Sequence, residues 1–344
     1  MSTATYARWD GVGRPFHLDR VPTPEPGPGR ALVAVDLATV CGSDLHTVRG
    51  HRSSPCPSVL GHEQVGRVVA VSADDPPLAS DGTVLAPGDR VVWSVTVACG
   101  TCDRCRSGLG QKCRRLRKYG HERLAADWLL SGGFATHCEL LPGTTIVRMP
   151  EQVPDAVAGP ASCATATVAA VLAAAGPLAG RRLLVTGAGL LGVTAAAMAT
   201  EAGAEVVVTD PDRVRRALAI RFGATEEAPA SGEFDAAVEL SGHPTAVATC
   251  VDALRTGGRA VLAGSVSASP PVAIDPERVV RGLLTITGVH NYRPGDLVDA
   301  VAFLAAHHER YPFAELVAPG HPLDRIDDAF GTQRPGVLRQ AVLP

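Results

Sequence analysis

Four cysteines stand close together in one short segment of the chain, and their chemistry suits a metal: Cys99, Cys102, Cys105 and Cys113. Thiolate sulfur is a soft ligand that favours zinc, and four such ligands leave no coordination position for a substrate or water. The intervening residues are polar and rich in glycine, so the segment cannot fold around an apolar core of its own. The spacing predicts a structural zinc lobe over residues 97–115. An iron–sulfur cluster and incidental thiols are the alternatives.

Three further potential ligands, Cys41, His62 and Cys163, are spread along the first half of the chain. A catalytic zinc needs three protein ligands and one open position, and two cysteines with one histidine form a known ligand set. Taken singly, Cys41 is typical of an inert buried thiol and His62 of a satisfied polar residue. Together they indicate a second metal centre. The remaining cysteines have no such partners and are expected to pack in the interior: Cys56, Cys138 and Cys250.

A glycine-rich loop follows a strand expected at 182–186 and precedes a helix expected at 193–202. Its residues are Gly187, Gly189, Leu190, Leu191 and Gly192. In this context the glycines permit a tight turn and a close approach of the backbone to a pyrophosphate, whose charge is attracted by the helix N-terminus. Strand, loop and helix together predict a dinucleotide-binding site.

Asp210 ends the next expected strand, at 205–210. Its carboxylate can accept hydrogen bonds from the adenosine ribose hydroxyls and would repel a 2′-phosphate, which favours NAD. NADP remains an alternative because Arg213, Arg215 and Arg216 follow directly. These arginines suit a 2′-phosphate but also suit the solvated start of a helix.

The chain is long enough for two domains, and its composition and residue pattern change along its length. Residues 1–153 are rich in glycine, proline and short valine runs, which predicts a mainly β domain. From 154 to 294 helical and strand-like segments alternate, which predicts a doubly wound α/β domain with a parallel sheet. Residues 295–344 form a tail with a helix at 296–307. Further expected elements are strands at 31–37, 65–71, 90–97, 234–240, 259–263, 284–288 and 338–343, a buried helix at 161–175 and a surface loop at 224–232.

Composition limits the classes of partner. The formal net charge of -3 and the pI near 6.4 give no basic footprint for nucleic acid. Nine cysteines, an odd number with four in one cluster, suggest metal ligands in a reducing compartment. The N-terminus lacks the pattern of a signal peptide, and 161–175 is too short and polar for a membrane span. We therefore expect a cytoplasmic protein with a small-molecule substrate and neither nucleic-acid nor membrane partners.

These motifs make the chain similar, over nearly its whole length, to the zinc-containing medium-chain alcohol dehydrogenases. The resemblance is carried by Cys41 with Ser43, Asp44 and His46, by Gly61, His62, Glu63 and Gly66, by the four-cysteine lobe, by Cys163 with Thr167, and by the glycine loop with Asp210. It implies a GroES-like catalytic domain interrupted by a Rossmann domain, so that the tail returns to the catalytic domain. It also implies two zinc ions per chain, NAD(H) and a homodimer or homotetramer.

The same resemblance implies roles for single residues. Cys41, His62 and Cys163 would hold the catalytic zinc, and Glu63 would lie close enough to take a turn as a ligand. Asp44 would orient His62 and fix its tautomer. Two contacts to the cofactor are implied as well: Thr167 to the nicotinamide and Arg215 to the adenosine ribose.

A proton relay is suggested by Ser43 and His46, which are three residues apart and would share one face on a helical turn. Zinc would act as a Lewis acid on the substrate oxygen while hydride passes to NAD. Ser43 would receive the substrate proton and pass it, through the nicotinamide ribose hydroxyl, to His46 at the surface. The alternatives are a helix-capping role for Ser43 and an exposed, idle His46.

The substrate is less well defined. Residues 41–52, 118–122 and 131–134 resemble a narrower group of bacterial alcohol dehydrogenases associated with phosphonate catabolism. Basic residues near two of the motifs favour an anionic alcohol, aldehyde or ketone if they face the active site: Arg49, His51, Arg52, Arg117, Lys118 and His121. A solvated basic surface is the alternative, and so is a neutral polyol or cyclitol. A non-catalytic redox sensor or assembly protein would be expected to have lost Cys41, His62 or Cys163.

Overall fold

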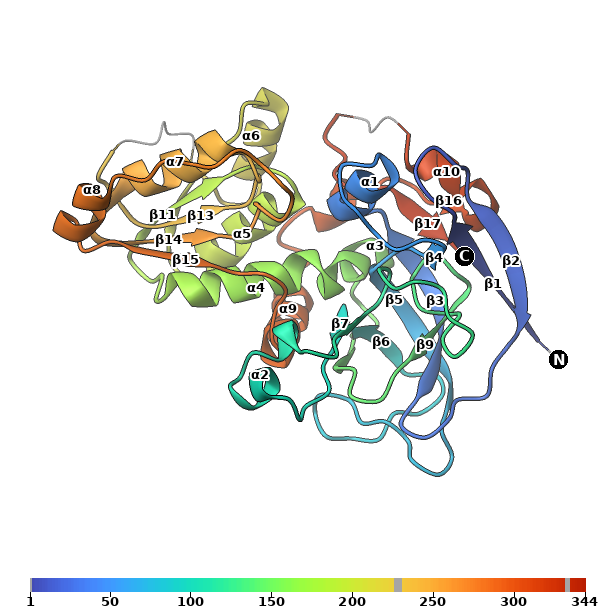
Figure 1. The fold of residues 1–344 in the computed structure, drawn as a ribbon. Helices are drawn as coiled ribbons and strands as arrows, with labels where there is room; N and C mark the ends of the chain where they lie inside the picture. The colour runs from blue at the N-terminus through green and yellow to red at the C-terminus, as the bar shows by residue number, and fades with distance from the viewer. Residues whose placement is uncertain (1, 226–230, 332–334) are drawn as a thin grey trace. The chain divides into compact units, whose positions relative to one another are not determined.

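The computed structural model describes residues 2–225, 231–331 and 335–344 (Figure 1). The chain forms two compact units. Unit 1 consists of residues 1–163, 293–308 and 313–344, and unit 2 consists of 164–292 and 309–312. Unit 1 extends past the boundary expected at 153 and therefore contains Cys163. Most of the loop expected at 224–232 lies outside the described residues.

Unit 1 is built on β-sheets, because its short valine-rich segments alternate buried and less buried side chains. A small sheet has the order β2 (His17–Pro22), β1 (Thr3–Trp9), β4 (Ser58–Val59). The larger sheet has the order β10 (Ile146–Arg148), β6 (Arg90–Trp93), β5 (Glu63–Val71), β3 (Ala31–Thr39), β17 (Ala341–Leu343), β16 (His321–Pro322), and β9 (His137–Leu140) also pairs with β3.

The antiparallel ladder between β3 and β5 positions the first two potential metal ligands. Thr39, near the end of β3, pairs with Glu63, at the start of β5. Cys41 lies just after β3 and His62 just before β5, so this register brings the two side chains to one end of the sheet. The C-terminal strand β17 joins the same place, because Ala341 pairs with Thr39.

Short elements fill the rest of unit 1. The strand expected at 90–97 is two strands, because Ser94 donates its hydroxyl to the carbonyl of Thr96 and turns the chain between them. The other elements are α1 (Gly42–Val48), β7 (Thr96–Val97), α2 (Asp103–Arg106), η1 (Gly110–Lys112), β8 (Arg117–Lys118), α3 (Asp155–Ala158), η2 (Gly159–Ser162), α9 (Pro294–His307), η3 (Phe313–Leu316), η4 (Leu323–Arg325) and α10 (Ile326–Ala329).

Unit 2 is a parallel, doubly wound sheet, as predicted from its alternating segments. Its strand order is β12 (Glu205–Thr209), β11 (Arg182–Thr186), β13 (Phe234–Glu239), β14 (Leu254–Leu262), β15 (Thr285–Gly288). Figure 1 shows α4 and α7 on opposite sides of this sheet. The helices are α4 (Ala164–Ala175), α5 (Leu190–Glu201), α6 (Arg213–Ile220), α7 (Pro244–Ala253) and α8 (Pro276–Arg281).

The helix expected at 161–175 and the strand expected at 259–263 have different bounds in the structure. The helix expected at 161–175 is broken at Cys163, whose φ of -124° and ψ of -67° are not helical. Ser162 donates its hydroxyl to the carbonyl of His62 and holds the break in place. Strand β14 begins five residues earlier than expected, at Leu254, because Gly257 and Gly258 conceal its start in the sequence.

Among the described residues no single helix is both long and apolar enough to cross a membrane. The bent pair Asp155–Ser162 and Ala164–Ala175 meets the length and composition limits only when its two parts are taken together.

Candidate metal centres and cofactor site

Cys41, His62 and Cys163 converge within unit 1. Their potential ligand atoms all lie within 4.8 Å of one another. The side chains of Cys41 and His62 are buried, and that of Cys163 is partly buried. Two sulfur ligands and one imidazole nitrogen at this separation fit a zinc ion with a remaining coordination position. The structure thus brings together the three residues that the sequence placed at a second metal centre.

The pKa values of Cys41 and His62 depend on each other and on the charged groups around them. A hydrogen bond from the Cys163 thiol, the charge of Arg339 and that of His62 hold the pKa of Cys41 well below its ordinary value, although burial opposes this. Burial disfavours a charged His62, yet Asp44 and the Cys41 thiolate outweigh it and raise the pKa of His62 to about 10. The protons on His62 and Cys163 stand where a cation would bind, so metal binding would release them.

Asp44 lies behind His62, as the resemblance implied. One carboxylate oxygen is 3.4 Å from His62 Nδ1, and the other accepts the backbone N–H of Cys41 at 3.0 Å. This second bond also caps α1, so the start of the helix and the orientation of the imidazole are fixed by one side chain. Nε2 of His62 is the ring nitrogen left for a metal.

Ser43 and His46 both lie on α1, as expected. The hydroxyl of Ser43 is 3.2 Å from His62 Nε2 and therefore lies at the metal side of the imidazole. His46 is exposed, and its ring centroid is 5.8 Å from that of His51, which is also exposed. The helix thus carries one hydroxyl at the site and one imidazole at the surface.

Glu63 is buried beside the trio but belongs to an ion pair. Its carboxylate accepts hydrogen bonds from Arg339 at 2.7 and 3.0 Å and from the Thr39 hydroxyl at 2.7 Å. Burial raises the pKa of Glu63 to about 7 against the opposing charge of Arg339. Arg339 Nη2 is also 3.8 Å from the sulfur of Cys41. The sequence analysis missed Arg339, although a single arginine within the apolar segment 338–343 was a usable signal.

The four-cysteine cluster forms the second metal-sized group. All four sulfurs lie within 4.8 Å of one another. The backbone N–H groups of Cys99 and Arg115 point at the sulfur of Cys113, at 3.2 and 3.3 Å. The N–H of Thr101 and the side chain of Arg115 lower the pKa of Cys99 to about 5. Donors aimed at sulfur stabilise thiolates, and four thiolates fit a closed zinc site.

The cysteines assigned to packing lie outside both groups. Cys138 and Cys250 are buried, and Cys56 packs at the edge of the unit 1 core.

The glycine loop of unit 2 has the geometry of a phosphate cradle. Gly187 has a φ of +98°, and a Cβ on Gly192 would stand 1.8 Å from the carbonyl oxygen of Gly187. A Cβ on Gly189 would meet nothing within 4 Å, which leaves open space before α5. Asp210 accepts the N–H of Ala188 at 2.8 Å, so its carboxylate is fixed beside the loop. These features fit a bound pyrophosphate.

The arginines after Asp210 are partly occupied by local contacts. Arg216 donates to the carbonyl oxygens of Asp210 and Pro211. Arg215 is half exposed, and its Nε lies 3.9 Å from a carboxylate oxygen of Asp212. Thr167 lies on the first turn of α4 and is partly buried.

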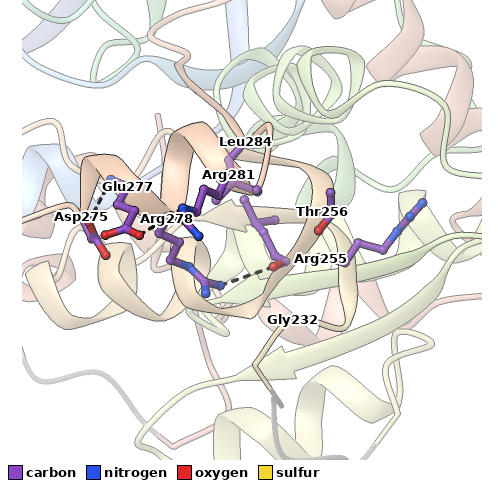
Figure 2. A pocket seen from close by; sticks show the side chains of 10 residues that line it. Gly232, Arg255, Thr256, Asp275, Glu277, Arg278, Arg281 and Leu284 are labelled. Carbon is purple, nitrogen blue, oxygen red and sulfur yellow. Dashed lines mark hydrogen bonds and ion pairs between the residues drawn. The ribbon is translucent and has the colours of Figure 1, made fainter.

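A separate pocket of about 520 Å³ lies where β14 begins and α8 ends (Figure 2). The glycine loop follows the C-terminal end of β11, whereas the pocket lies at the N-terminal end of β14. In a parallel sheet the loop and the pocket therefore lie at opposite ends of the strands. The basic groups of the pocket are already paired: Arg255 binds Asp235, Arg281 binds Glu277 at 3.1 Å, and Arg278 donates to the carbonyl of Asp252. We assign this pocket no role in the chemistry.

Comparison with known proteins agrees with this architecture. Residues 27–151 match the alcohol dehydrogenase GroES-like domain, and residues 191–306 match the zinc-binding dehydrogenase family. An L-threonine 3-dehydrogenase of Deinococcus deserti is 34% identical over 290 residues, 78% of each chain. Another, from Anaeromyxobacter sp. (strain Fw109-5), is 31% identical over 94% of this chain and 93% of its own. The crystal structure of an alcohol dehydrogenase from Thermotoga maritima, 26% identical, superposes over 100% of both chains with a TM-score of 0.91.

The chain therefore belongs to the zinc-containing medium-chain alcohol dehydrogenase family. Its members are NAD(P)-linked oxidoreductases that act on CH–OH groups of small molecules. The predicted fold class, a GroES-like domain with a Rossmann domain, is confirmed.

Proposed function

We propose that this protein is a cytoplasmic, NAD-dependent alcohol dehydrogenase with two zinc ions per chain. Cys41, His62 and Cys163 bind the catalytic zinc, and the four-cysteine cluster binds the structural zinc. The observation that carries the proposal is the convergence of the trio with Asp44 behind His62. A chain that only used zinc to hold its fold would have no need of this second, three-ligand group.

The bound cofactors supply two functions: zinc polarises the substrate oxygen as a Lewis acid, and NAD accepts the hydride. The protein supplies orientation and a path for the proton. Asp44 holds His62 in the tautomer whose Nε2 is free to bind metal. Ser43, with its hydroxyl at the metal side of His62, accepts the substrate proton as it gives up its own, and exposed His46 takes up the released proton and passes it to solvent.

Asp210 supports the choice of NAD over NADP. Its buried carboxylate lies beside the glycine loop, where a 2′-phosphate would meet a like charge. Arg216 does not offset this charge for a ligand, because its guanidinium is bound to backbone carbonyls. By analogy with the family, we also propose a homodimer or homotetramer.

The proposal is tested by metal counting and by a substrate screen. Native mass spectrometry should find two zinc ions per chain in the wild type and in the matched control Cys56→Ala, but one in Cys163→Ser. Wild-type protein should then form NADH with at least one member of a panel of primary and secondary alcohols that includes L-threonine, a polyol and a cyclitol. One zinc per chain and no reduction of NAD by any alcohol would favour the non-catalytic alternative.

A further inference from the structure

The segment from Lys118 to His121 packs directly against the metal ligand His62. The ring centroids of His62 and His121 are 4.6 Å apart. His121 Nδ1 is 2.9 Å from the carbonyl oxygen of Tyr119, and the N–H of His121 donates to the carbonyl of Lys118 at 3.2 Å. The backbone itself is in contact here, since a Cβ on Gly120 would stand 2.4 Å from the carbonyl oxygen of Gly61. Lys118 is therefore held beside the metal centre.

The charge of Lys118 acts on the same centre. Burial and the charge of Arg52 lower the pKa of Lys118, while the thiols of Cys41 and Cys163 raise it. The ammonium group thus lies within electrostatic range of both sulfur ligands and of a second cation. Arg52 follows α1, where its N–H donates to the carbonyl of His46 at 3.2 Å. Both side chains are partly buried.

Neither of these two cations has a carboxylate partner within the described part of the chain. No carboxylate there lies within ion-pair distance of Lys118 or Arg52. The carboxylate of Glu122 accepts the backbone N–H of Lys118, but its ion pair is with Arg117, at 3.6 Å. Arg117 also stacks on Trp128, 4.8 Å from the ring centroid. Arg117 is thus paired, whereas Lys118 and Arg52 have no carboxylate partner.

Two partly buried like charges close together are costly unless an anion completes the arrangement. A divalent cation in the trio would displace the protons of His62 and Cys163, so it would leave the net charge of the centre unchanged and supply no counter-charge to Lys118 and Arg52. The exposed basic residues nearby differ, because Arg49 and His51 are solvated and need no partner. An oxyanion on the substrate would supply the missing charge, with the guanidinium as a fork and the ammonium as a point charge.

We propose that Lys118 and Arg52 form a subsite for an oxyanion carried by the alcohol substrate, a carboxylate, phosphate or phosphonate group. The inference rests on the proposed function, because it assigns the substrate class of the same site. It also opposes one feature of threonine, whose ammonium group would be repelled here while its carboxylate would be bound.

The first test compares matched alcohols with wild-type enzyme. 3-Hydroxypropylphosphonate is set against its dimethyl ester, and 4-hydroxybutanoate against 4-hydroxybutanamide. We expect kcat/KM to be at least about tenfold higher for each anion than for its neutral partner, and the two anions distinguish phosphonate from carboxylate. Neutral alcohols that form NADH equally fast would overturn this inference while leaving the proposed function intact. Failure of every alcohol would instead count against the proposed function.

The second test measures binding without turnover. Propylphosphonate, which has no hydroxyl group, is titrated by calorimetry into the zinc-loaded protein in the absence of NAD. We expect the dissociation constant to rise at least about tenfold in Lys118→Met and in Arg52→Met, and Lys118→Arg should recover part of the loss. Arg49→Met removes the same charge from an exposed neighbouring position and should bind like the wild type.

Two results would contradict the subsite. One is equal binding by wild type, Lys118→Met and Arg52→Met. The other is an equal loss in Arg49→Met, which would indicate a diffuse field rather than a defined pair of residues. The melting temperature and zinc content of each variant identify misfolding, and because the two substitutions lie on separate segments, either one alone suffices for the test.

Discussion

Glu63 and Arg339 form a buried ion pair although 276 positions separate them in the sequence. The pair joins the start of β5 to the C-terminal tail and lies against Cys41. Removing one partner of a buried pair leaves the other charge uncompensated, which costs about 3–5 kcal/mol. We expect Arg339→Met to lower the free energy of unfolding of unit 1 by that amount. Urea unfolding followed by tryptophan fluorescence reports on this unit, because Trp9, Trp93 and Trp128 all lie in it.

A double variant controls for the loss of the arginine itself. In Glu63→Gln/Arg339→Met no unpaired charge remains, so the loss of stability should be smaller than in Arg339→Met alone. Equal stability of Arg339→Met and the wild type would show that the pair makes no net contribution.

The two metal centres should separate stability from turnover. Cys105→Ser removes one ligand of the four-cysteine cluster, and we expect one zinc per chain and a lower melting temperature, because the lobe has no apolar core of its own. Cys163→Ser should also retain one zinc but melt close to the wild type while losing turnover. Full activity and unchanged melting of Cys105→Ser would argue against this division. Zinc content by mass spectrometry and calorimetric melting give both readouts.

Zinc affinity of the four-cysteine cluster should increase with pH. Burial, followed by the thiols of Cys102 and Cys113, raises the pKa of Cys105 to about 12, so Cys105 is protonated near neutral pH in the metal-free protein. Zinc must displace that proton, and an equilibrium that releases protons shifts toward the bound state as pH rises. Competition with a chromophoric chelator from pH 6 to 8 should show a falling dissociation constant, and a flat curve would contradict the assignment.

His46→Ala should slow turnover, because the relay loses the surface imidazole that passes the substrate proton to solvent. A positioned acid or base contributes roughly 100- to 10,000-fold, and a group at the surface, which water can replace, should contribute less, about tenfold. His51 lies beside His46 and could substitute for it, so His46→Ala/His51→Ala is the sharper variant. An unchanged rate and profile in the double variant would remove His46 from the relay.

Asp210→Asn should shift the cofactor preference. Hydrogen bonds to charged groups contribute roughly 1.5–3 kcal/mol, so KM for NAD should rise about tenfold or more, and KM for NADP should fall because the like charge is gone. The amide can still accept the N–H of Ala188, which keeps the loop in place. Kinetics with both cofactors measure the ratio, and a ratio equal to that of the wild type would refute the role of Asp210.

Local signals predicted much of the molecule. The four cysteines, the glycine loop and Asp210 each lie within one continuous segment whose spacing reflects a single structural need. Because the glycine loop directly follows strand β11, the sequence also predicted the bounds of that strand, 182–186. The break at Cys163 was not expected, because it depends on Ser162 donating to the carbonyl of His62, a contact across 100 positions.

Arg339 and the Lys118–Arg52 pair show what sequence spacing omits. Arg339 reaches Glu63 only because β17 pairs with β3, and this register is not encoded near either residue. Lys118 and Arg52 were both noted as basic, but so were exposed Arg49 and paired Arg117. The structure is needed to distinguish basic side chains that are paired or fully solvated from those that are partly buried and lack a carboxylate partner.

The contact between Gly61 and Gly120 limits how this enzyme could change its substrate. Each glycine directly precedes a histidine of the site, and both have a positive φ, of +90° and +71°. Because their backbones touch, the separation between His62 and the segment 118–121 is not adjustable by side-chain size. A change in substrate charge must therefore arise by replacing side chains such as Lys118, while the backbone around them keeps its dimensions. Neither glycine can be substituted as part of such a change.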